Sequence, residues 1–169
     1  MSLRSAASAA FMMLSLVQAL ANPLEEELAA NGGNSCWERS YHAAHLTAHP
    51  GQRTVKIRLS TEVQDDGSIV GQLGINLRKR NGAGGRFDYT AFGYCKAQGA
   101  ALACPSEWDA GAFLIEKARD GLLVRNKRMI VNPSNYDAED VAPGAVDLSA
   151  SDDKSWLLRR IEDEGCDIY

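Results

Sequence analysis

Three neighbouring segments decide the fold: RFDYTAFGYC (residues 86–95), CPSEWDAG (104–111) and FLIEKARDGLLV (113–124). In the first, non-charged residues recur at every second position from Phe87 to Cys95, which is typical of a half-buried strand. Further on, Asp120-Gly121 separates two short apolar runs, and an Asp-Gly pair often forms the tight turn of a β-hairpin. The stretch therefore predicts a β-meander, which is the nucleus from which the rest of the chain can be interpreted.

The same alternation of apolar and polar residues continues on both sides of this meander. Residues 53–63 carry Val55, Ile57 and Leu59 on one face, and the pattern resumes over residues 69–77 after the turn at 64–67. This arrangement predicts an antiparallel pair of strands. Further short strands are predicted at Phe113–Ile115, Leu122–Val124, Met129–Val131 and Lys154–Ile161.

These segments together predict a mainly β chain. We expect residues 36–169 to form a single antiparallel β-barrel or sandwich of about seven or eight strands. One short N-terminal helix is expected near residues 42–49, and disulfides are expected to staple the domain. Trp156 shares a predicted strand face with Leu158, so we expect the indole to anchor the core.

The first residues have the features of an export signal. Arg4 provides a positive start, an apolar run extends from Ala9 to Leu20, and Ala19-Leu20-Ala21 fits the small-x-small rule of signal peptidase. We therefore expect a signal peptide over residues 1–21 and a flexible leader over residues 22–35, which have little to bury. The alternative for this leader is a helix of a couple of turns that begins at Asn22-Pro23 and ends at Asn31-Gly32-Gly33. An uncleaved anchor is the alternative, although the apolar run is shorter than the roughly 20 residues of a spanning helix. The mature chain is expected to be periplasmic or secreted, with no membrane span.

Export changes how the four cysteines are interpreted, because an even number in an oxidising compartment usually forms bridges. Cys95 and Cys104 flank a turn of small residues and can face each other across a hairpin. Cys36 and Cys166 lie near the two ends of the folded region. We predict these two pairings among the three that four cysteines allow. Zinc coordination is the rival hypothesis, but the chain has no Cys-x-x-Cys pair.

The three histidines lie close together, at His42, His45 and His49. On a helix these spacings would place the imidazoles along one stripe, where they could act as ligands of a transition metal. The segment lacks the glutamate of the His-Glu-x-x-His motif. The alternative is a short helix that covers one end of the sheet, with Tyr41 and Leu46 facing inward and the histidines at its edge.

Several functional classes find no support in the sequence. A net charge of −4 argues against general nucleic-acid binding, which requires a basic surface. The Gly-x-Ser-x-Gly elbow of serine hydrolases is absent. A carboxylate pair such as Glu107 with Asp109 is of a kind that an acidic chain supplies by chance. The acidic loop with Asp137, Glu139, Asp140 and Asp147 could hold a cation, but such loops are usually solvated.

A binding protein is the function that these observations favour. Phe92 and Tyr94 occupy the second face of a predicted strand, where they could form a ligand surface. We expect a small exported protein that is not an enzyme, needs no cofactor and binds an unknown envelope protein or small ligand. The alternative is an envelope protein that binds a transition metal through His42, His45 and His49.

The layout of leader, early Cys36, β-meander and late Cys166 resembles that of small exported bacterial β-barrel proteins, a group that includes periplasmic lysozyme inhibitors. The resemblance is architectural and implies a barrel in the cell envelope. Since no inhibitory motif can be matched residue by residue, it assigns no site.

Overall fold

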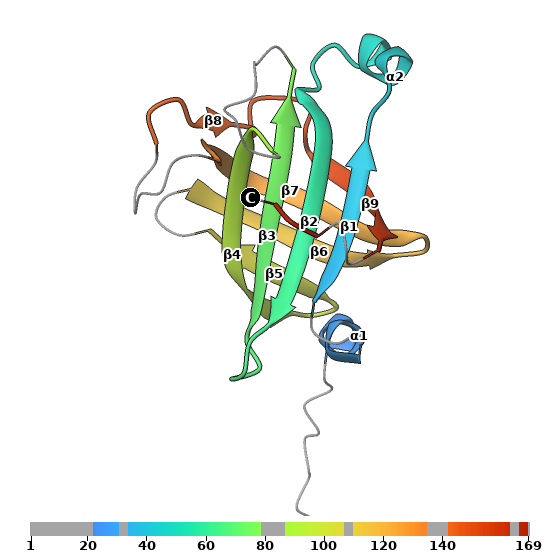
Figure 1. Cartoon of the computed structure of the whole chain (residues 1–169), viewed down its shortest axis with the longest axis vertical. Coiled ribbons are helices and arrows are strands. Elements are labelled where there is room, and N and C mark those ends of the chain that lie inside the picture. The colour runs from blue at the N-terminus through green and yellow to red at the C-terminus, as the bar shows by residue number, and fades with distance from the viewer. Residues whose placement is uncertain are drawn as a thin grey trace, which may run out of the picture.

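The computed structural model describes residues 22–30, 34–78, 87–106, 110–134, 142–162 and 166–168. Within these ranges, nine antiparallel strands form one sheet that closes in a ring (Figure 1). The predicted mainly β, antiparallel class is confirmed, and the sheet is a barrel. Its elements are α1 (Pro23–Ala30), β1 (Ser35–Ser40), α2 (Ala43–Ala48), β2 (Thr54–Val63), β3 (Ile69–Leu77), β4 (Tyr89–Gln98), β5 (Ala101–Pro105), β6 (Gly111–Ala118), β7 (Gly121–Pro133), β8 (Val146–Asp147) and β9 (Ser155–Ile161).

The order of the strands is that of a meander closed by the last long strand. From β1 to β7, each strand pairs with the next one in sequence, and β9 pairs with both β1 and β7. The end of β7 also pairs with the start of β4, and β8 adds to β7. In Figure 1, β1 to β4 form the front wall, with the other strands behind them. Because the sheet closes in this way, strands that would otherwise lie at an open edge have hydrogen-bonding partners.

The hairpin predicted at Asp120-Gly121 joins β6 to β7. Ala118 pairs with Gly121, so the loop is tight, and Gly121 has a φ of 147°. A Cβ atom at this position would lie 1.9 Å from the carbonyl oxygen of Leu158. Glycine is therefore required both by the backbone angle and by the close approach of β9.

The inside of the barrel is packed with apolar side chains from alternating positions of the strands. Trp156 is 1% exposed and Leu158 is completely buried, whereas Leu157 between them is 38% exposed. The predicted inner face of this strand is therefore correct. Phe113 and Ile115 of β6 are also completely buried, as expected for inward positions.

The prediction of two separate strands at Leu122–Val124 and Met129–Val131 is wrong, because both belong to β7. The strand continues through Arg128, whose φ of 80° is the left-handed conformation of an irregular position. The register also shifts between Gly111 and Phe113 on β6. A Cβ at Gly111 would lie 1.4 Å from the Arg128 carbonyl oxygen, so the two chains approach too closely there for a side chain. This bulge lets one strand pair first with β6 and then with β4.

The stretch before the histidines contains a strand that the sequence analysis did not predict. Residues 35–40 form β1, which pairs with β2 and β9 and so closes the barrel. Only the following six residues, Ala43–Ala48, are helical, in agreement with the short helix expected near His42. Tyr41 packs partly against the core, while α2 itself has no buried residue.

The expectation of a flexible leader over residues 22–35 is also wrong for its described part. Helix α1 lies at the end of the barrel opposite α2 (Figure 1), and its Leu24 and Leu28 are completely buried. Asn22 caps this helix: its side-chain oxygen accepts from the amide of Leu24. Its side-chain nitrogen donates to the carbonyl oxygens of Gly99 and Ala101, 2.9 Å from each. Two leucines four residues apart are enough to cover the open end of the core.

Both predicted disulfides are present. Cys95 and Cys104 join β4 to β5, and Cys36 is bonded to Cys166 across a sequence separation of 130 residues. Two bridges of this kind indicate an oxidising, extracytoplasmic environment. The predicted signal peptide, residues 1–21, lies outside the described residues; within them, no helix is long and apolar enough to cross a membrane.

Candidate functional site

The segment Cys166–Ile168, here called the C-terminal strap, lies across the outside of β2 and β3 (Figure 1). The Cys36–Cys166 disulfide holds its start against β1. Ile168 is 2% exposed, and together with Phe87 it covers Gly74 of β3. A Cβ on Gly74 would lie 2.6 Å from the Phe87 ring and 3.0 Å from Ile168, so glycine makes room for this outer layer.

The strap and the segment before β4 cover part of the outer surface, so two residues have surroundings that the strand pattern does not predict. Phe87 was expected on the same strand face as Tyr89, but it precedes β4 and packs on the outside of the barrel. Arg58 alternates with Ile57 and Leu59 along β2, so its side chain points outward. That face is covered, however, so that Arg58 is only 4% exposed.

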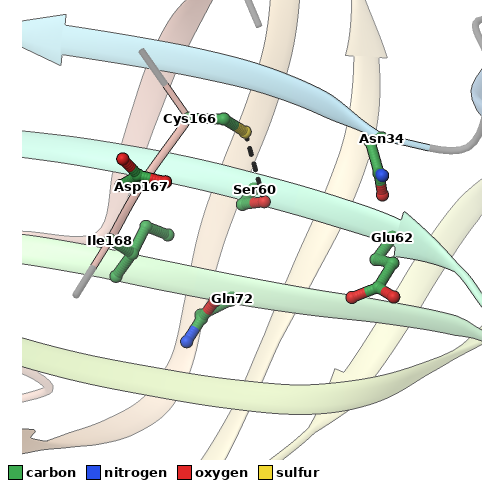
Figure 2. Close-up of a pocket in the computed structure, with 7 residues that line it drawn as sticks. All are labelled: Asn34, Ser60, Glu62, Gln72, Cys166, Asp167 and Ile168. Carbon is green, nitrogen blue, oxygen red and sulfur yellow. Dashed lines mark hydrogen bonds between the residues drawn. The ribbon is translucent and has the colours of Figure 1, made fainter. Parts of the chain in front are cut away.

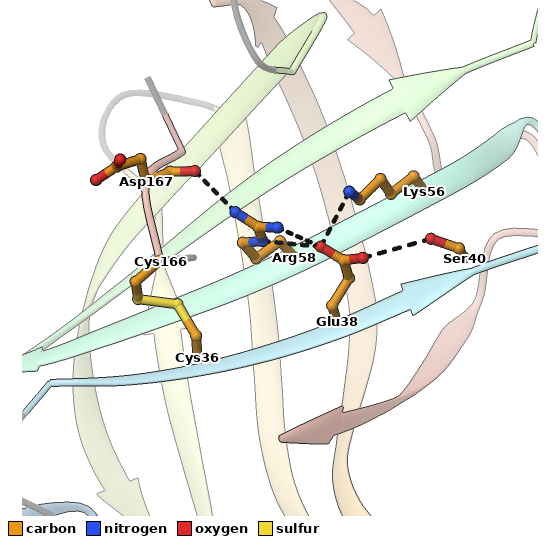
Figure 3. Close-up of polar contacts among 7 residues, drawn as sticks. All are labelled: Cys36, Glu38, Ser40, Lys56, Arg58, Cys166 and Asp167. Carbon is orange, nitrogen blue, oxygen red and sulfur yellow. Dashed lines mark hydrogen bonds and ion pairs between the residues drawn. A yellow bond between two sulfur atoms is a disulfide. The ribbon is translucent and has the colours of Figure 1, made fainter. Parts of the chain in front are cut away.

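A carboxylate neutralises the buried guanidinium of Arg58 (Figure 3). The Nε and Nη2 atoms of Arg58 donate to one oxygen of Glu38, at 2.9 and 2.5 Å, and the Nη1 atom donates to the Asp167 carbonyl oxygen at 3.0 Å. Lys56 lies 3.1 Å from the same Glu38 oxygen. Both cations also lie over the Phe87 ring, at 5.2 Å for Arg58 and 5.4 Å for Lys56. The cluster therefore ties the strap, β1 and β2 together.

Glu38 makes the stability of this layer depend on pH. Burial raises the pKa of Glu38, but the hydrogen bonds and charges of Arg58 and Lys56 outweigh it and hold the pKa below the ordinary value of 4.5. The folded protein therefore binds a proton at Glu38 less readily than the unfolded chain. The stabilisation is fully present above pH 4.5 and is lost as the pH falls through the lower folded pKa.

Glu38→Gln is accordingly expected to lower the free energy of unfolding by about 2 kcal/mol at neutral pH, because charge-assisted hydrogen bonds to Arg58 are lost. Urea unfolding at a series of pH values measures this difference. The gap between the wild type and the variant should narrow below pH 4.5. If the difference in the free energy of unfolding stayed constant at acidic pH, the charge of Glu38 would not be the source of the stabilisation.

A pocket of about 450 Å³ opens beside the strap on the outer face of the barrel (Figure 2). Its polar lining comes from Asn34, Ser60, Glu62 and Gln72, and the strap forms its remaining wall. The Ser60 hydroxyl lies 3.4 Å from the sulfur of Cys166, so β2 and the strap are in direct contact at the edge of the pocket. A volume of this size is in the range of small-ligand sites.

An exposed aromatic pair adjoins this pocket. Two rows of outward-facing residues run across β2, β3 and β4, one made of Ser60, Gln72 and Phe92, the other of Glu62, Val70 and Tyr94. Residues directly opposite on neighbouring strands have their side chains in contact range. Phe92 is 37% and Tyr94 50% exposed, and their rings meet edge to face with centroids 6.4 Å apart. The pocket and the aromatic pair thus form one continuous surface, here called the β2–β4 face.

The backbone behind the aromatic pair is held firmly. Gly93, between the two rings, faces inward, where a Cβ would lie 2.4 Å from the Pro105 carbonyl oxygen. Gly71, its partner on β3, leaves space inside for the Phe113 ring and the sulfur of Cys95. The close approach of β5 and the Cys95–Cys104 bridge therefore fix the strand that presents Phe92 and Tyr94 to solvent.

Helix α2 brings the three predicted histidines near one another. The ring centroids of His45 and His49 are 4.4 Å apart, and those of His42 and His45 are 6.2 Å apart. Two ring nitrogens are already engaged: His42 Nδ1 accepts from the His45 amide, and His45 Nε2 lies 3.0 Å from the Gln52 side-chain oxygen. Within the part of the chain that the structure describes, no group of three His, Cys, Asp or Glu residues is placed to hold a metal ion. Metal binding by these histidines stays a prediction.

The remaining candidates from the sequence lie mostly beyond the described ranges. Glu107 and Asp109 are outside them, and so are Asp137, Glu139 and Asp140 of the acidic loop. Asp147 is described, in β8. Its pKa is lowered by hydrogen bonds from Ser149, which is ordinary turn chemistry.

The alternation of residues 87–95 predicts the aromatic pair, but no pattern in the sequence marks the polar lining of the pocket. Ser60 and Gln72 read as ordinary outward residues of two alternating strands, and only the register places them in one row with Phe92. The position of Cys166 carried the one available signal. A cysteine beyond the last strand that pairs with Cys36 has to bring the C-terminus back to residue 36, and the outward position of Cys36 on β1 then places the strap on the outside of the barrel.

Comparison of the chain with protein-family models, with curated proteins and with solved structures gives no significant match. The assignment of function therefore rests on the geometry of the β2–β4 face and of α2.

Proposed function

We propose that this protein is an exported binding protein without catalytic activity, and that its β2–β4 face receives the ligand or partner. The observation that carries the proposal is the continuity of the pocket with the exposed pair Phe92 and Tyr94. Large exposed aromatic side chains beside a pocket are typical of recognition surfaces. Export to the periplasm or the medium is expected from residues 1–21 and agrees with the two disulfides.

The packed interior of the barrel argues for a binding site on its outer surface. The interior is filled by Trp156, Phe113 and many aliphatic side chains. A ligand could enter only if this packing were disrupted, which costs free energy, whereas exposed side chains can bind it without such a change. The outer face of β2 to β4 needs no such rearrangement, since it is backed by the packed core and fastened by a disulfide on each side.

Capture experiments with immobilised mature protein test the proposal. The double variant Phe92→Ala/Tyr94→Ala is compared with the wild type and with Leu157→Ala, a matched control that removes an exposed apolar side chain on β9. From an envelope extract, the wild type and the control should retain a component that the double variant loses. Retention of the same components by all three proteins would contradict the proposal.

The alternative function, binding of a transition metal, rests on the proximity of His42, His45 and His49 around α2. Calorimetric titration with zinc, copper and nickel tests it, and the triple His→Ala variant is the control. Tight binding that disappears in the triple variant would favour the metal-binding function over recognition at the β2–β4 face.

A further inference from the structure

The hydrogen-bonding groups around the pocket are of mixed character. Asn34 and Gln72 each offer an amide that donates and accepts, and Ser60 contributes a hydroxyl. Glu62 adds a carboxylate that only accepts, and Asp167 of the strap adds a second one. Figure 2 shows the side chains of Asn34, Ser60, Glu62 and Gln72 around the open space beside the strap. The pocket therefore offers both donors and acceptors.

The hydrogen-bonding groups of the pocket suit some ligands better than others, depending on the charge of the ligand. A phosphate or carboxylate ligand only accepts hydrogen bonds and would face the carboxylates of Glu62 and Asp167, while none of the described residues lining the pocket is basic. Arg58, the buried cation nearby, is directed to Glu38 and to the Asp167 carbonyl oxygen. An ammonium or guanidinium ligand only donates, so it would pair with the two carboxylates but make no use of the amide N–H groups of Asn34 and Gln72. A ligand hydroxyl both donates and accepts, and it suits all of these groups.

The aromatic pair supplies the complementary apolar surface. Phe92 and Tyr94 are 37% and 50% exposed, and they lie directly beside Gln72 and Val70 of β3. The C–H face of a sugar ring is apolar and packs on aromatic rings, whereas its hydroxyl groups lie around the ring edge. A saccharide laid along the β2–β4 face would place its apolar face on the aromatic pair and its hydroxyls toward the amides.

We infer that the β2–β4 face is a binding site for a neutral, polyhydroxylated ligand of the saccharide class, oriented by Gln72, Asn34 and Ser60 and stacked on Phe92 and Tyr94. This inference rests on the proposed binding function and specifies its ligand. The site is open at the surface, which suits an extended chain of sugar units better than one enclosed molecule.

The test is titration calorimetry of the mature protein with neutral tri- and tetrasaccharides of glucose, galactose or N-acetylglucosamine. Trilysine and inorganic phosphate are the charged comparison probes. At least one saccharide series should bind, and saturation-transfer NMR should place its C–H protons against aromatic rings. Phe92→Ala/Tyr94→Ala should weaken this binding about tenfold or more, and Gln72→Ala by about fivefold.

Matched controls separate the site from general surface effects. Gln98→Ala removes an exposed amide elsewhere on β4, and Leu157→Ala removes an exposed apolar group on β9; both should bind within about twofold of the wild type. Glu62→Gln should also change saccharide affinity only a few-fold, because Gln retains an acceptor. Saccharide binding that the Phe92, Tyr94 and Gln72 variants leave unchanged would overturn the inference.

The outcome separates the ligand class from the proposed function. If trilysine binds and Glu62→Gln abolishes that binding, or if no saccharide binds at all, the saccharide assignment is wrong. The proposed function still stands in that case if the aromatic double variant loses its captured component. It fails together with the inference if that variant captures the same components as the wild type.

Discussion

Trp156→Ala is expected to lower the free energy of unfolding by about 3–5 kcal/mol, the usual cost of removing a large aromatic side chain from a core. Trp156 is 1% exposed and is among the largest fully buried side chains of the barrel. It lies on β9, whose pairing with β1 and β7 closes the ring, so a cavity there weakens the closure itself. Chemical unfolding of the purified variant, or its failure to accumulate as folded protein, measures the effect.

Trp156→Phe is the informative control for this position. The indole nitrogen of Trp156 is buried and has no hydrogen-bond partner among the described residues. An unpaired buried donor costs about 1–3 kcal/mol, and phenylalanine removes it while it keeps an aromatic ring. Trp156→Phe should therefore cost clearly less than Trp156→Ala. Equal stability of the wild type and the alanine variant would contradict the placement of Trp156 in the core.

The double variant Cys36→Ser/Cys166→Ser is expected to lose about 5 kcal/mol of stability, since the chain-entropy model assigns that value to a bridge across so long a loop. The sequence separation of the two cysteines is 130 residues. Without the bridge, the strap would be held only by contacts such as Ile168 on Gly74 and the Asp167 carbonyl on Arg58. Urea unfolding midpoints of the oxidised wild type and of the variant measure the difference.

Cys95→Ser/Cys104→Ser is the matched comparison, because it removes a bridge of the same chemistry with a sequence separation of only 9 residues. The expected loss is roughly 3 kcal/mol. The larger effect should therefore come from the bridge that fastens the strap. If the short bridge proved the more important one, packing around Cys95 and Phe113 would outweigh the closure of the long loop.

The sequence predicted most strands correctly because their patterns depend on neighbouring residues alone. Residues 53–63 and 69–77 alternate over enough positions to define two strands and most of their inner faces. Val55 is the exception, because the register shifts between Thr54 and Lys56 and Thr54 is buried instead. The pairing of Cys95 with Cys104 follows from a short turn of small residues between them. Such local signals leave few alternatives once the chain is known to form antiparallel hairpins.

The errors concern contacts between distant parts of the chain. Strand β1 is defined by pairing with β2 and β9, and its segment SCWERS shows no clean alternation. Helix α1 is stabilised by the open end of a core that exists only after the barrel has formed. Likewise, the burial of Arg58 depends on a strap more than a hundred residues away in sequence. Tertiary contacts of this kind override local preference.

The candidate site shows the same division. Phe92 and Tyr94 could be recognised as outward aromatic residues from the alternation of their strand alone. Their neighbours Gln72 and Ser60 become part of a site only through the register of three strands. The wall formed by the strap requires in addition the path of the C-terminus. Sequence patterns therefore predict which side chains are outward, but not which of them meet.

Amide chemical-shift mapping is the most direct test of the β2–β4 face as the binding surface. Isotope-labelled mature protein is titrated with the component that the wild type captures and the aromatic double variant does not. The largest shifts are expected at residues of this face, including Ser60, Gln72 and Tyr94. Shifts concentrated around α2, from Tyr41 to Gln52, with the β2–β4 face unchanged, would contradict it.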